Sequence, residues 1–342
     1  MVDFIQEFAT KKGFLVTRTP FEECADFLTI DLNAGNPKGH LFLAHMDTVH
    51  QKGSFGNPCV KIEDGKMHGP GTIDCKGGIA IALLAMVALK HAGYTNHTRL
   101  ILTSDEEISN VLGGEKEKEF FYQSVKGFKS ALNCETSRDN QVVVSRKGIL
   151  RKEITITGKG GHSGIDYFRC ISAVKEAAYK IIELEKHSQV GGTTFNCGVI
   201  HGGTVANCVP EKCTVIVDVR VVSNQGLQQA QEILQKVVDT SYVEGTSATI
   251  KDVSMRPPFF KNEQTQKLFD QMQSISQKYN LGVLVSVESG GGSDSCYTQA
   301  GGVASLCGLG GSGQNVHTTK EYIILESIEQ RAKMLSAFCV EF

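Results

Sequence analysis

The chain has 342 residues, a formal net charge of −2, 41% hydrophobic residues and 21% charged residues. This length predicts about two domains and a sizeable buried core. The nearly balanced charge, without a basic cluster interleaved with aromatic residues, gives no reason to expect a nucleic acid or an anionic membrane as partner. The composition is typical of a soluble globular protein.

Eleven cysteines are spread along the chain, and no two of them have Cys-x-x-Cys spacing. Isolated thiols of this kind favour a reducing compartment, so we expect a cytoplasmic protein. The first segment, Met1–Lys12, is typical of an amphipathic helix rather than a secretory signal. The most apolar stretch, Ile79–Leu89, is shorter than a membrane span and predicts a buried helix.

Residues 1 to about 147 alternate short apolar strands with helices. This pattern predicts an α/β domain with a mostly parallel sheet covered by helices. The strands that matter for the site are expected at His40–Ala44, Thr98–Thr103 and Ser130–Asn133.

The pattern then changes to the order β-α-β-β-α-β, which predicts a ferredoxin-like domain. Its expected elements are Ile149–Thr157, Ile171–Ser188, Thr193–His201, Cys213–Val222, Leu227–Val238 and Ala248–Met255. The α/β pattern resumes with a helix from Asn262 to about Tyr279, strands Val283–Val287 and Gly302–Leu306, and a final helix Glu321–Cys339. We therefore expect residues 148–258 to be inserted into a catalytic domain formed by residues 1–147 and 259–342.

Five short segments each carry one or two side chains of the kinds that bind metals, and four of these segments follow an expected strand. In open α/β sheets, ligands bind outside the carboxyl ends of the strands, so side chains far apart in sequence can converge there. Two histidines and several carboxylates suit a pair of divalent ions, with zinc as the first candidate. The residues are His45, Asp47, Asp74, Glu106, Glu107, Glu135 and His317.

His45 and Asp47 are two positions apart, so on an extended segment their side chains point the same way. Asp47 can then accept a hydrogen bond from the second imidazole nitrogen and fix the tautomer of a metal-bound His45. The alternative is a structural histidine followed by a turn-forming aspartate. Asp74 lies in the glycine-rich segment GPGTIDCKGG, where it is either an ordinary helix cap or a carboxylate bridging two ions.

Glu106 and Glu107 are adjacent, and Asp105 precedes them. Such a run is most often a solvated acidic loop. Consecutive residues leaving a strand diverge, however, so one can bind an ion while its neighbour reaches a metal-bound water. This division between a ligand and a general base is what a metallohydrolase needs.

The segments HMDTV, GPGTIDCKGG, SDEE, CETS and GHSG, with the late His317, resemble the motifs of a zinc metallopeptidase family. That family includes glutamate carboxypeptidase, acetylornithine deacetylase, succinyl-diaminopimelate desuccinylase and aminoacylase. The resemblance covers nearly the whole chain. It implies two metal ions, most readily Zn²⁺ with Co²⁺ or Mn²⁺ as alternatives, and a homodimer that pairs through the inserted lid domain.

The resemblance also implies roles for individual residues. Each ion would have one histidine, one glutamate and a share of the bridging Asp74. Glu106 would be the general base and Asp47 would orient a ligand, while the peptide bond Asp74–Cys75 is expected to be cis. The implied metal ligands are His45, Asp74, Glu107, Glu135 and His317.

Further residues match substrate-binding positions of the family. His162 in GKGGHSG matches a histidine that often reaches the partner subunit's active site, and Asn207 and Arg220 match polar residues of the lid. Gly292 and Ser293 lie in GGGSDS, which matches a loop whose backbone N–H groups bind a carboxylate. The alternatives are a simple loop histidine, a solvent-facing arginine and an ordinary glycine-rich turn.

Two features depart from the family pattern. The usual Pro-Gly-Asn-Ala after the GHSG motif is replaced by DYFRCISA at Asp166–Ala173. The family also normally has another helix before the segment where this chain starts. The first departure leaves the substrate range open, and the second leaves open a non-catalytic relative.

These residues favour a dinuclear zinc hydrolase that cleaves an amide bond beside a free carboxylate, in a peptide or an N-acyl amino acid. One alternative is a deacylase of the acetylornithine deacetylase type. An alternative of another class is a non-catalytic, metal-binding dimeric module. Glu106 argues against this last alternative, because a module that only binds metal needs no base beside its ligand.

Overall fold

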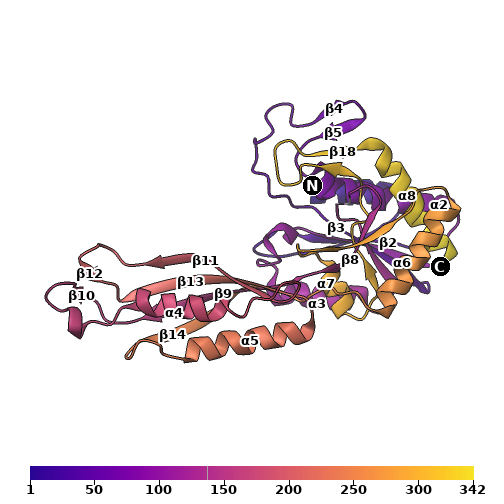
Figure 1. The fold of residues 1–342 in the computed structure, drawn as a ribbon. Helices are drawn as coiled ribbons and strands as arrows, with labels where there is room; N and C mark the ends of the chain where they lie inside the picture. The colour runs from indigo at the N-terminus through magenta and orange to yellow at the C-terminus, as the bar shows by residue number, and fades with distance from the viewer. Residues whose placement is uncertain (137) are drawn as a thin grey trace. The chain divides into compact units, whose positions relative to one another are not determined.

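The computed structural model describes residues 1–136 and 138–342. The chain forms two compact units, Met1–Arg146 together with Lys261–Phe342, and Lys147–Phe260. Each unit has its own cluster of buried hydrophobic side chains. The first unit is therefore discontinuous in the sequence, and the second is inserted into it (Figure 1).

The first unit is built on a six-stranded sheet. Its strand order is β1 (Leu15–Thr19), β2 (Phe27–Leu32), β6 (His97–Thr103), β3 (Lys38–His45), β7 (Ser130–Asn133) and β16 (Ser305–Leu306). The strands β6, β3, β7 and β16 are parallel, whereas β1 and β2 add an antiparallel edge. The prediction of a mostly parallel sheet is confirmed.

Helices cover both faces of this sheet, and its strands β2, β6, β3 and β7 are buried on both sides. On one face, Leu28, Phe42 and Leu100 join the main core together with α1 (Val2–Lys11), α2 (Gly77–His91), α6 (Glu263–Lys278) and α8 (Leu325–Glu341). On the other face, Phe27 meets Phe120 of α3 (Gly114–Val125) edge-on. The short α7 (Ser295–Ala300) packs against α3 through the stacked rings of Tyr297 and Phe121.

The helical segment Thr72–His91 is long and apolar enough to cross a membrane by length and composition alone. Its most apolar window is 72% buried inside the protein. A helix that is apolar on all sides and enclosed in this way is typical of a protein core. The expectation of a buried helix at Ile79–Leu89 is confirmed within α2.

Smaller sheets complete the first unit. Strand β8 (Gln141–Arg146) pairs in parallel with β15 (Val285–Ser289). An antiparallel sheet joins β17 (Gly313–Gln314), β18 (Tyr322–Ile324), β5 (Lys66–His68) and β4 (Lys61–Glu63).

The predicted bounds of the last strand and the last helix were partly wrong. The final helix begins at Leu325 rather than at Glu321, because Tyr322–Ile324 pair with β5 as a strand. The strand expected at Gly302–Leu306 is limited to Ser305–Leu306, because Gly302 adopts a positive φ of 84° and turns the chain.

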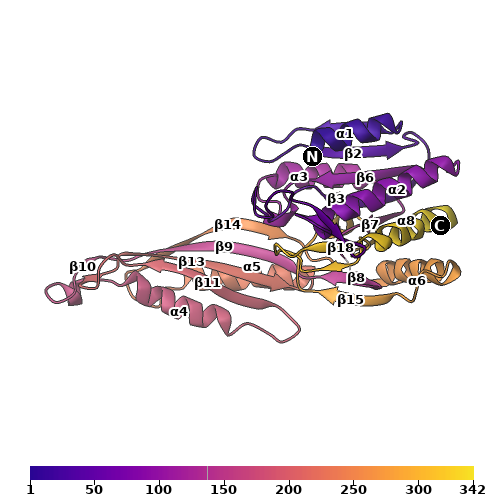
Figure 2. The same ribbon diagram turned by 90° about the horizontal axis from the view of Figure 1, so that it is seen from above.

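The second unit has the expected order β-α-β-β-α-β, so this prediction is confirmed (Figure 2). Its antiparallel sheet has the order β11-β13-β9-β14. Alternate residues of β13, from Cys213 to Val221, are buried against α4 and α5, which cover one face of the sheet. The elements are β9 (Gly148–Thr157), α4 (Ala173–Glu185), β11 (Thr194–Gly202), β13 (Lys212–Val221), α5 (Asn224–Asp239) and β14 (Ser247–Arg256).

Candidate metal centre

Three parallel strands place the first group of candidate ligands. Strands β6, β3 and β7 are neighbours in the sheet, so their carboxyl ends share one edge. His45 is the last residue of β3, Glu106 and Glu107 follow β6 in a short 3₁₀ turn, and Glu135 follows β7. Parallel pairing alone therefore brings residues from three distant segments to one place.

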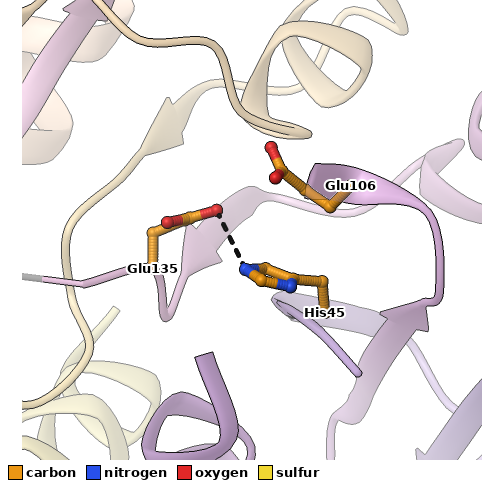
Figure 3. A group of neighbouring side chains, drawn as sticks. All are labelled: His45, Glu106 and Glu135. Atoms are coloured by element: carbon orange, nitrogen blue, oxygen red, sulfur yellow. Dashed lines mark ion pairs between the residues drawn. The ribbon is translucent and has the colours of Figure 1, made fainter. Parts of the chain in front are cut away.

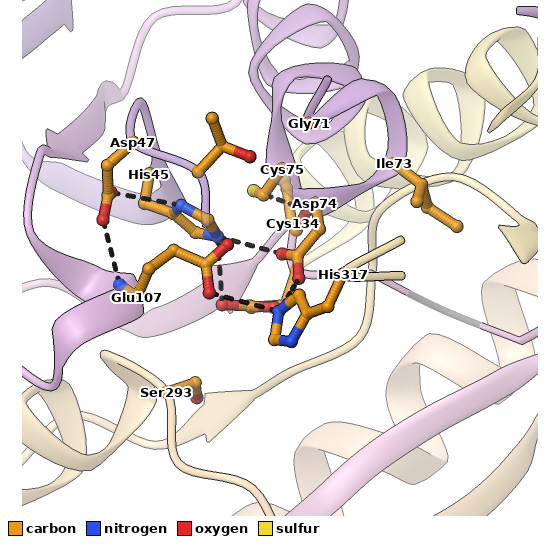
Figure 4. A network of polar contacts seen from close by, with 12 residues as sticks. His45, Asp47, Gly71, Ile73, Asp74, Cys75, Glu107, Cys134, Ser293 and His317 are labelled. Atoms are coloured by element: carbon orange, nitrogen blue, oxygen red, sulfur yellow. Dashed lines mark hydrogen bonds and ion pairs between the residues drawn. The ribbon is translucent and has the colours of Figure 1, made fainter. Parts of the chain in front are cut away.

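Asp74 reaches the same place from the loop that precedes α2. Its backbone is not helical, with φ −119° and ψ 89°, and the expected cis peptide bond between Asp74 and Cys75 is present. Oδ1 of Asp74 lies 3.0 Å from Nε2 of His45, and Oδ2 lies 3.2 Å from Nε2 of His317 (Figure 4). Each oxygen of this carboxylate thus faces a different histidine, which is the arrangement of a bridging ligand.

One glutamate accompanies each histidine. Oε1 of Glu135 lies 3.7 Å from Nε2 of His45, and Oε2 of Glu107 lies 3.2 Å from Nε2 of His317. The structure therefore brings together all five side chains predicted as ligands, as two pairs on either side of Asp74. Imidazole nitrogens and carboxylate oxygens suit zinc, cobalt or manganese.

The electrostatics of this cluster fit bound cations. Burial, followed by the negative charge of Asp74, raises the pKa of Glu107 to about 7. Burial also acts to raise the pKa of Asp74, but hydrogen bonds with His317 and His45 outweigh it and hold that pKa well below its usual range. The buried Oε1 atom of Glu107 has no hydrogen-bond partner among the described residues. A divalent ion would offset the negative charge of these crowded carboxylates and bind the unpartnered Oε1 of Glu107.

Asp47 lies where an orienting residue is needed. Its Oδ1 is 3.2 Å from Nδ1 of His45, the ring nitrogen on the side away from Asp74. Its Oδ2 accepts a hydrogen bond of 2.9 Å from the backbone N–H of Glu107. Asp47 therefore connects a histidine of one pair to the turn that carries the glutamate of the other pair.

Glu106 lies beside the first pair. Figure 3 shows its side chain with those of His45 and Glu135, and ligand atoms of these three residues lie within 4.8 Å of one another. The side chain is buried, and the turn that carries it is closed by a hydrogen bond of 2.9 Å from Ser109 N–H to the Glu106 carbonyl. A carboxylate placed here can exchange a proton with a water held between the two pairs.

Three of the predicted substrate-binding residues belong to the second unit. His162 is exposed, and its Nδ1 accepts hydrogen bonds from the N–H groups of Gly164 and Ile165. Asn207 is exposed, and the Arg220 guanidinium pairs with Asp218, with 2.6 Å between Nε and Oδ1. The roles of His162, Asn207 and Arg220 toward a substrate stay predictions.

The glycine-rich loop lies in the first unit. The Gly292 carbonyl accepts a hydrogen bond of 3.0 Å from Arg146, and the Ser293 hydroxyl is buried 3.4 Å from the thiol of Cys307. Arg146 also lies 3.9 Å from Glu135, so a buried cation joins this loop to a candidate ligand. Arg146 was not among the predicted site residues, and its one signal in the sequence is a charged residue that ends an apolar strand.

Comparison with known proteins identifies the class. The family model described as peptidase family M20/M25/M40 matches residues 41–341, so the chain belongs to this family. Carboxypeptidase G2 of Pseudomonas sp. (strain RS-16) is 25% identical over 99% of this chain and 83% of its own length. Acetylornithine deacetylase of Pasteurella multocida is 27% identical over 69% of this chain and 64% of its own length.

Solved structures share the fold. An aminopeptidase PepT from Bacillus cereus superposes with a TM-score of 0.78 at 22% identity, covering 99% of this chain and 92% of that chain. A dinuclear metal binding peptidase of the M20 family from Bacillus subtilis gives 0.72 at 13% identity, covering 99% and 90%. The family membership makes the chain a hydrolase acting on amide bonds.

Proposed function

We propose that this chain is a hydrolase with two co-catalytic divalent ions that cleaves an amide bond beside a free carboxylate. The observation that carries the proposal is Asp74, whose two oxygens face two separate His–Glu pairs. His45 and Glu135 would hold one ion, and His317 and Glu107 the other. We propose zinc, because imidazole and carboxylate ligands in sets of three suit this ion.

The chain's own residues would divide the work as follows. Bound divalent ions supply a Lewis acid and lower the pKa of a coordinated water toward neutrality. Asp47 would accept a hydrogen bond from Nδ1–H of His45, which leaves Nε2 without a proton as the ligand atom. Glu106 removes a proton from the attacking water and later returns it to the leaving amine.

Further residues would recognise the substrate. His162 donates a hydrogen bond to the developing oxyanion, and Arg220 and Asn207 bind the substrate's polar groups. The backbone N–H groups at Gly292 and Ser293 bind its carboxylate. These assignments are supported by the match to the family's motifs and by the proton-donating chemistry of each group.

Two substrate classes compete for this site. Carboxypeptidase G2 matches 99% of this chain, whereas the acetylornithine deacetylase match spans 69%, so we favour a carboxypeptidase-like activity. An N-acyl amino acid deacylase is the second candidate. A non-catalytic metal-binding module is disfavoured by Glu106, which is buried beside a ligand pair without being needed to complete either pair.

We also propose a homodimer formed through the second unit, in which β11 is an edge strand with mostly exposed side chains. Edge strands offer unpaired backbone groups to a second copy. Sedimentation equilibrium that finds only monomer at micromolar concentration would contradict this assembly.

We also propose a cytoplasmic location. The described residues carry eleven free thiols, which supports a reducing compartment.

The proposed function is tested by incubating the zinc-loaded protein with a mixed panel of dipeptides and N-acyl amino acids and identifying products by mass spectrometry. The Glu106→Gln variant serves as the matched control, because it keeps the size of the side chain but cannot accept a proton. We expect selective cleavage whose rate falls by about 10²- to 10⁴-fold in the variant. Both proteins should hold the same amount of zinc.

Two results would count against the proposal. Cleavage at an unchanged rate in Glu106→Gln would show that another group is the base. Absence of cleavage by a wild-type protein with two bound ions would favour the non-catalytic alternative. Cleavage of N-acyl amino acids without cleavage of any dipeptide would assign the deacylase activity instead.

A further inference from the structure

Glu321 is a buried carboxylate that lies four residues after His317. Only 1% of its surface is exposed. Its Oε1 accepts hydrogen bonds of 3.0 Å from the N–H of Ile73 and 3.1 Å from the N–H of Asp74. Its Oε2 accepts one of 3.0 Å from the N–H of Gly71 and lies 2.7 Å from Nε2 of His50.

These contacts explain how the loop around Asp74 keeps its shape. The segment Thr72–Lys76 is irregular, and Gly71 ahead of it adopts a left-handed φ of 68°. Backbone N–H groups in such a segment lack the partners that a regular helix would give them. The Glu321 carboxylate accepts hydrogen bonds from two of them, Ile73 and Asp74, and from Gly71 just before the segment, so this side chain anchors the backbone at Asp74.

Glu321 also joins the segments that carry other candidate ligands. It lies on the same segment as His317, whose Nε2 is 3.2 Å from Oδ2 of Asp74. His50 follows His45 and Asp47 on the segment after β3, and its ring meets that of Phe55 edge-on at 4.8 Å. The Glu321 carboxylate thus contacts two segments and lies on a third. The three segments are far apart in the sequence, and each bears a candidate ligand.

We propose that Glu321 is a positioning residue that holds Asp74 between His45 and His317. The inference deepens the proposed metal centre and rests on it. Among the described residues, the Glu321 carboxylate accepts its hydrogen bonds from backbone N–H groups and from His50, and none from a ligand side chain. It acts through the Asp74 backbone and through the chain that carries His317. His50 completes the arrangement by donating the fourth hydrogen bond to the carboxylate.

The test measures zinc affinity and not activity alone. The metal-free protein is titrated with zinc against a chromophoric chelator, and the cobalt-loaded protein is examined by its visible absorption spectrum. In Glu321→Gln one acceptor oxygen becomes an amide N–H that faces backbone donors, so Asp74 loses its position. We expect at least one of the two zinc affinities to fall by about 10- to 100-fold, with a changed cobalt spectrum.

The controls separate positioning from general stability. Glu326→Gln makes the same chemical change on an exposed side chain of α8 and should leave both readouts unchanged. Glu321→Asp keeps both oxygens and should restore part of the affinity. If Glu321→Gln does not fold, His50→Gln provides the measurement, because it weakens one hydrogen bond to the carboxylate and should lower zinc affinity in the same direction.

The possible results distinguish failure of the role of Glu321 from failure of the proposed metal centre. A wild-type protein that binds fewer than two zinc ions would contradict the metal centre. The role of Glu321 would be overturned if the wild-type protein binds two zinc ions and the folded Glu321 and His50 variants bind both ions as tightly, with the same cobalt spectrum. The metal centre itself would then stand. A lower melting temperature without any change in zinc affinity would likewise make Glu321 merely structural.

Discussion

Glu117 shows how a single buried side chain supports the turn beside the site. It lies on α3, is fully buried, and accepts a hydrogen bond from the side chain of Asn110. Burial, followed by the negative charges of Asp294 and Asp105, raises the pKa of Glu117 to about 10. At neutral pH this side chain is therefore protonated and neutral in the folded protein.

This proton predicts a pH dependence of stability. The unfolded chain releases it near the ordinary glutamate pKa of about 4.3, whereas the folded protein keeps it to about pH 10. Between these values the folded state binds one more proton, so the contribution of Glu117 to the free energy of unfolding is full below pH 4 and decreases as the pH rises. Its slope is about 1.4 kcal/mol per pH unit.

In the Glu117→Gln variant the side chain at position 117 cannot titrate. Its contribution to the slope of the free energy of unfolding against pH should therefore be lost. Urea unfolding of the metal-free proteins at pH 6, 7 and 8 measures the difference, with the exposed Glu119→Gln on the same helix as control. Wild type and Glu119→Gln should lose stability more steeply than Glu117→Gln as the pH rises. Parallel pH profiles for all three proteins would show that Glu117 is charged in the folded state.

At the scale of elements, a buried lysine on one helix of the second unit caps the C-terminal end of another. Lys180 on α4 donates hydrogen bonds of 2.7 Å and 2.6 Å to the carbonyls of Val237 and Thr240 at the end of α5. Its Nζ also lies 2.9 Å from the buried carboxylate of Glu176. A lysine at this position satisfies carbonyls that have no partner in the last turn of a helix and interacts favourably with its dipole.

Removing this cation should destabilise the second unit strongly. Lys180→Met keeps much of the apolar side chain but leaves Glu176 without its cation and the carbonyls of α5 without this donor. Breaking a buried ion pair in this way costs about 3–5 kcal/mol. The exposed Lys175→Met on the same helix should change the free energy of unfolding by less than about 0.5 kcal/mol. Equal effects of the two substitutions in denaturant unfolding would refute the capping role.

At the scale of the whole molecule, the parts predicted well from the sequence are those with a local signal. Apolar runs located β3, β6 and β7, and the residues that follow them are at one sheet edge because parallel strands end together. A strand was likewise expected at Cys213–Val222, where the structure has β13. The candidate ligands were found because each stands at such a strand end or in a recognisable motif.

What the sequence missed depends on partners far away in the chain. Glu321 was expected to open the final helix, but the residues after it pair with β5, about 250 positions earlier, and its carboxylate meets the loop before α2. Arg146 is similar, because its contacts at Gly292 and Cys307 come from the last third of the chain. No local sequence pattern around either residue predicts such contacts.

The central claim is that Asp74 bridges two metal ions, and counting bound zinc tests it most directly. Metal-free protein is incubated with excess zinc, passed through a desalting column and analysed by inductively coupled plasma mass spectrometry, with the exposed Asp270→Ala as control. We predict two zinc ions per chain in wild type and control, and at most one in Asp74→Ala. Two ions retained in Asp74→Ala, or only one in wild type, would contradict a shared bridging carboxylate.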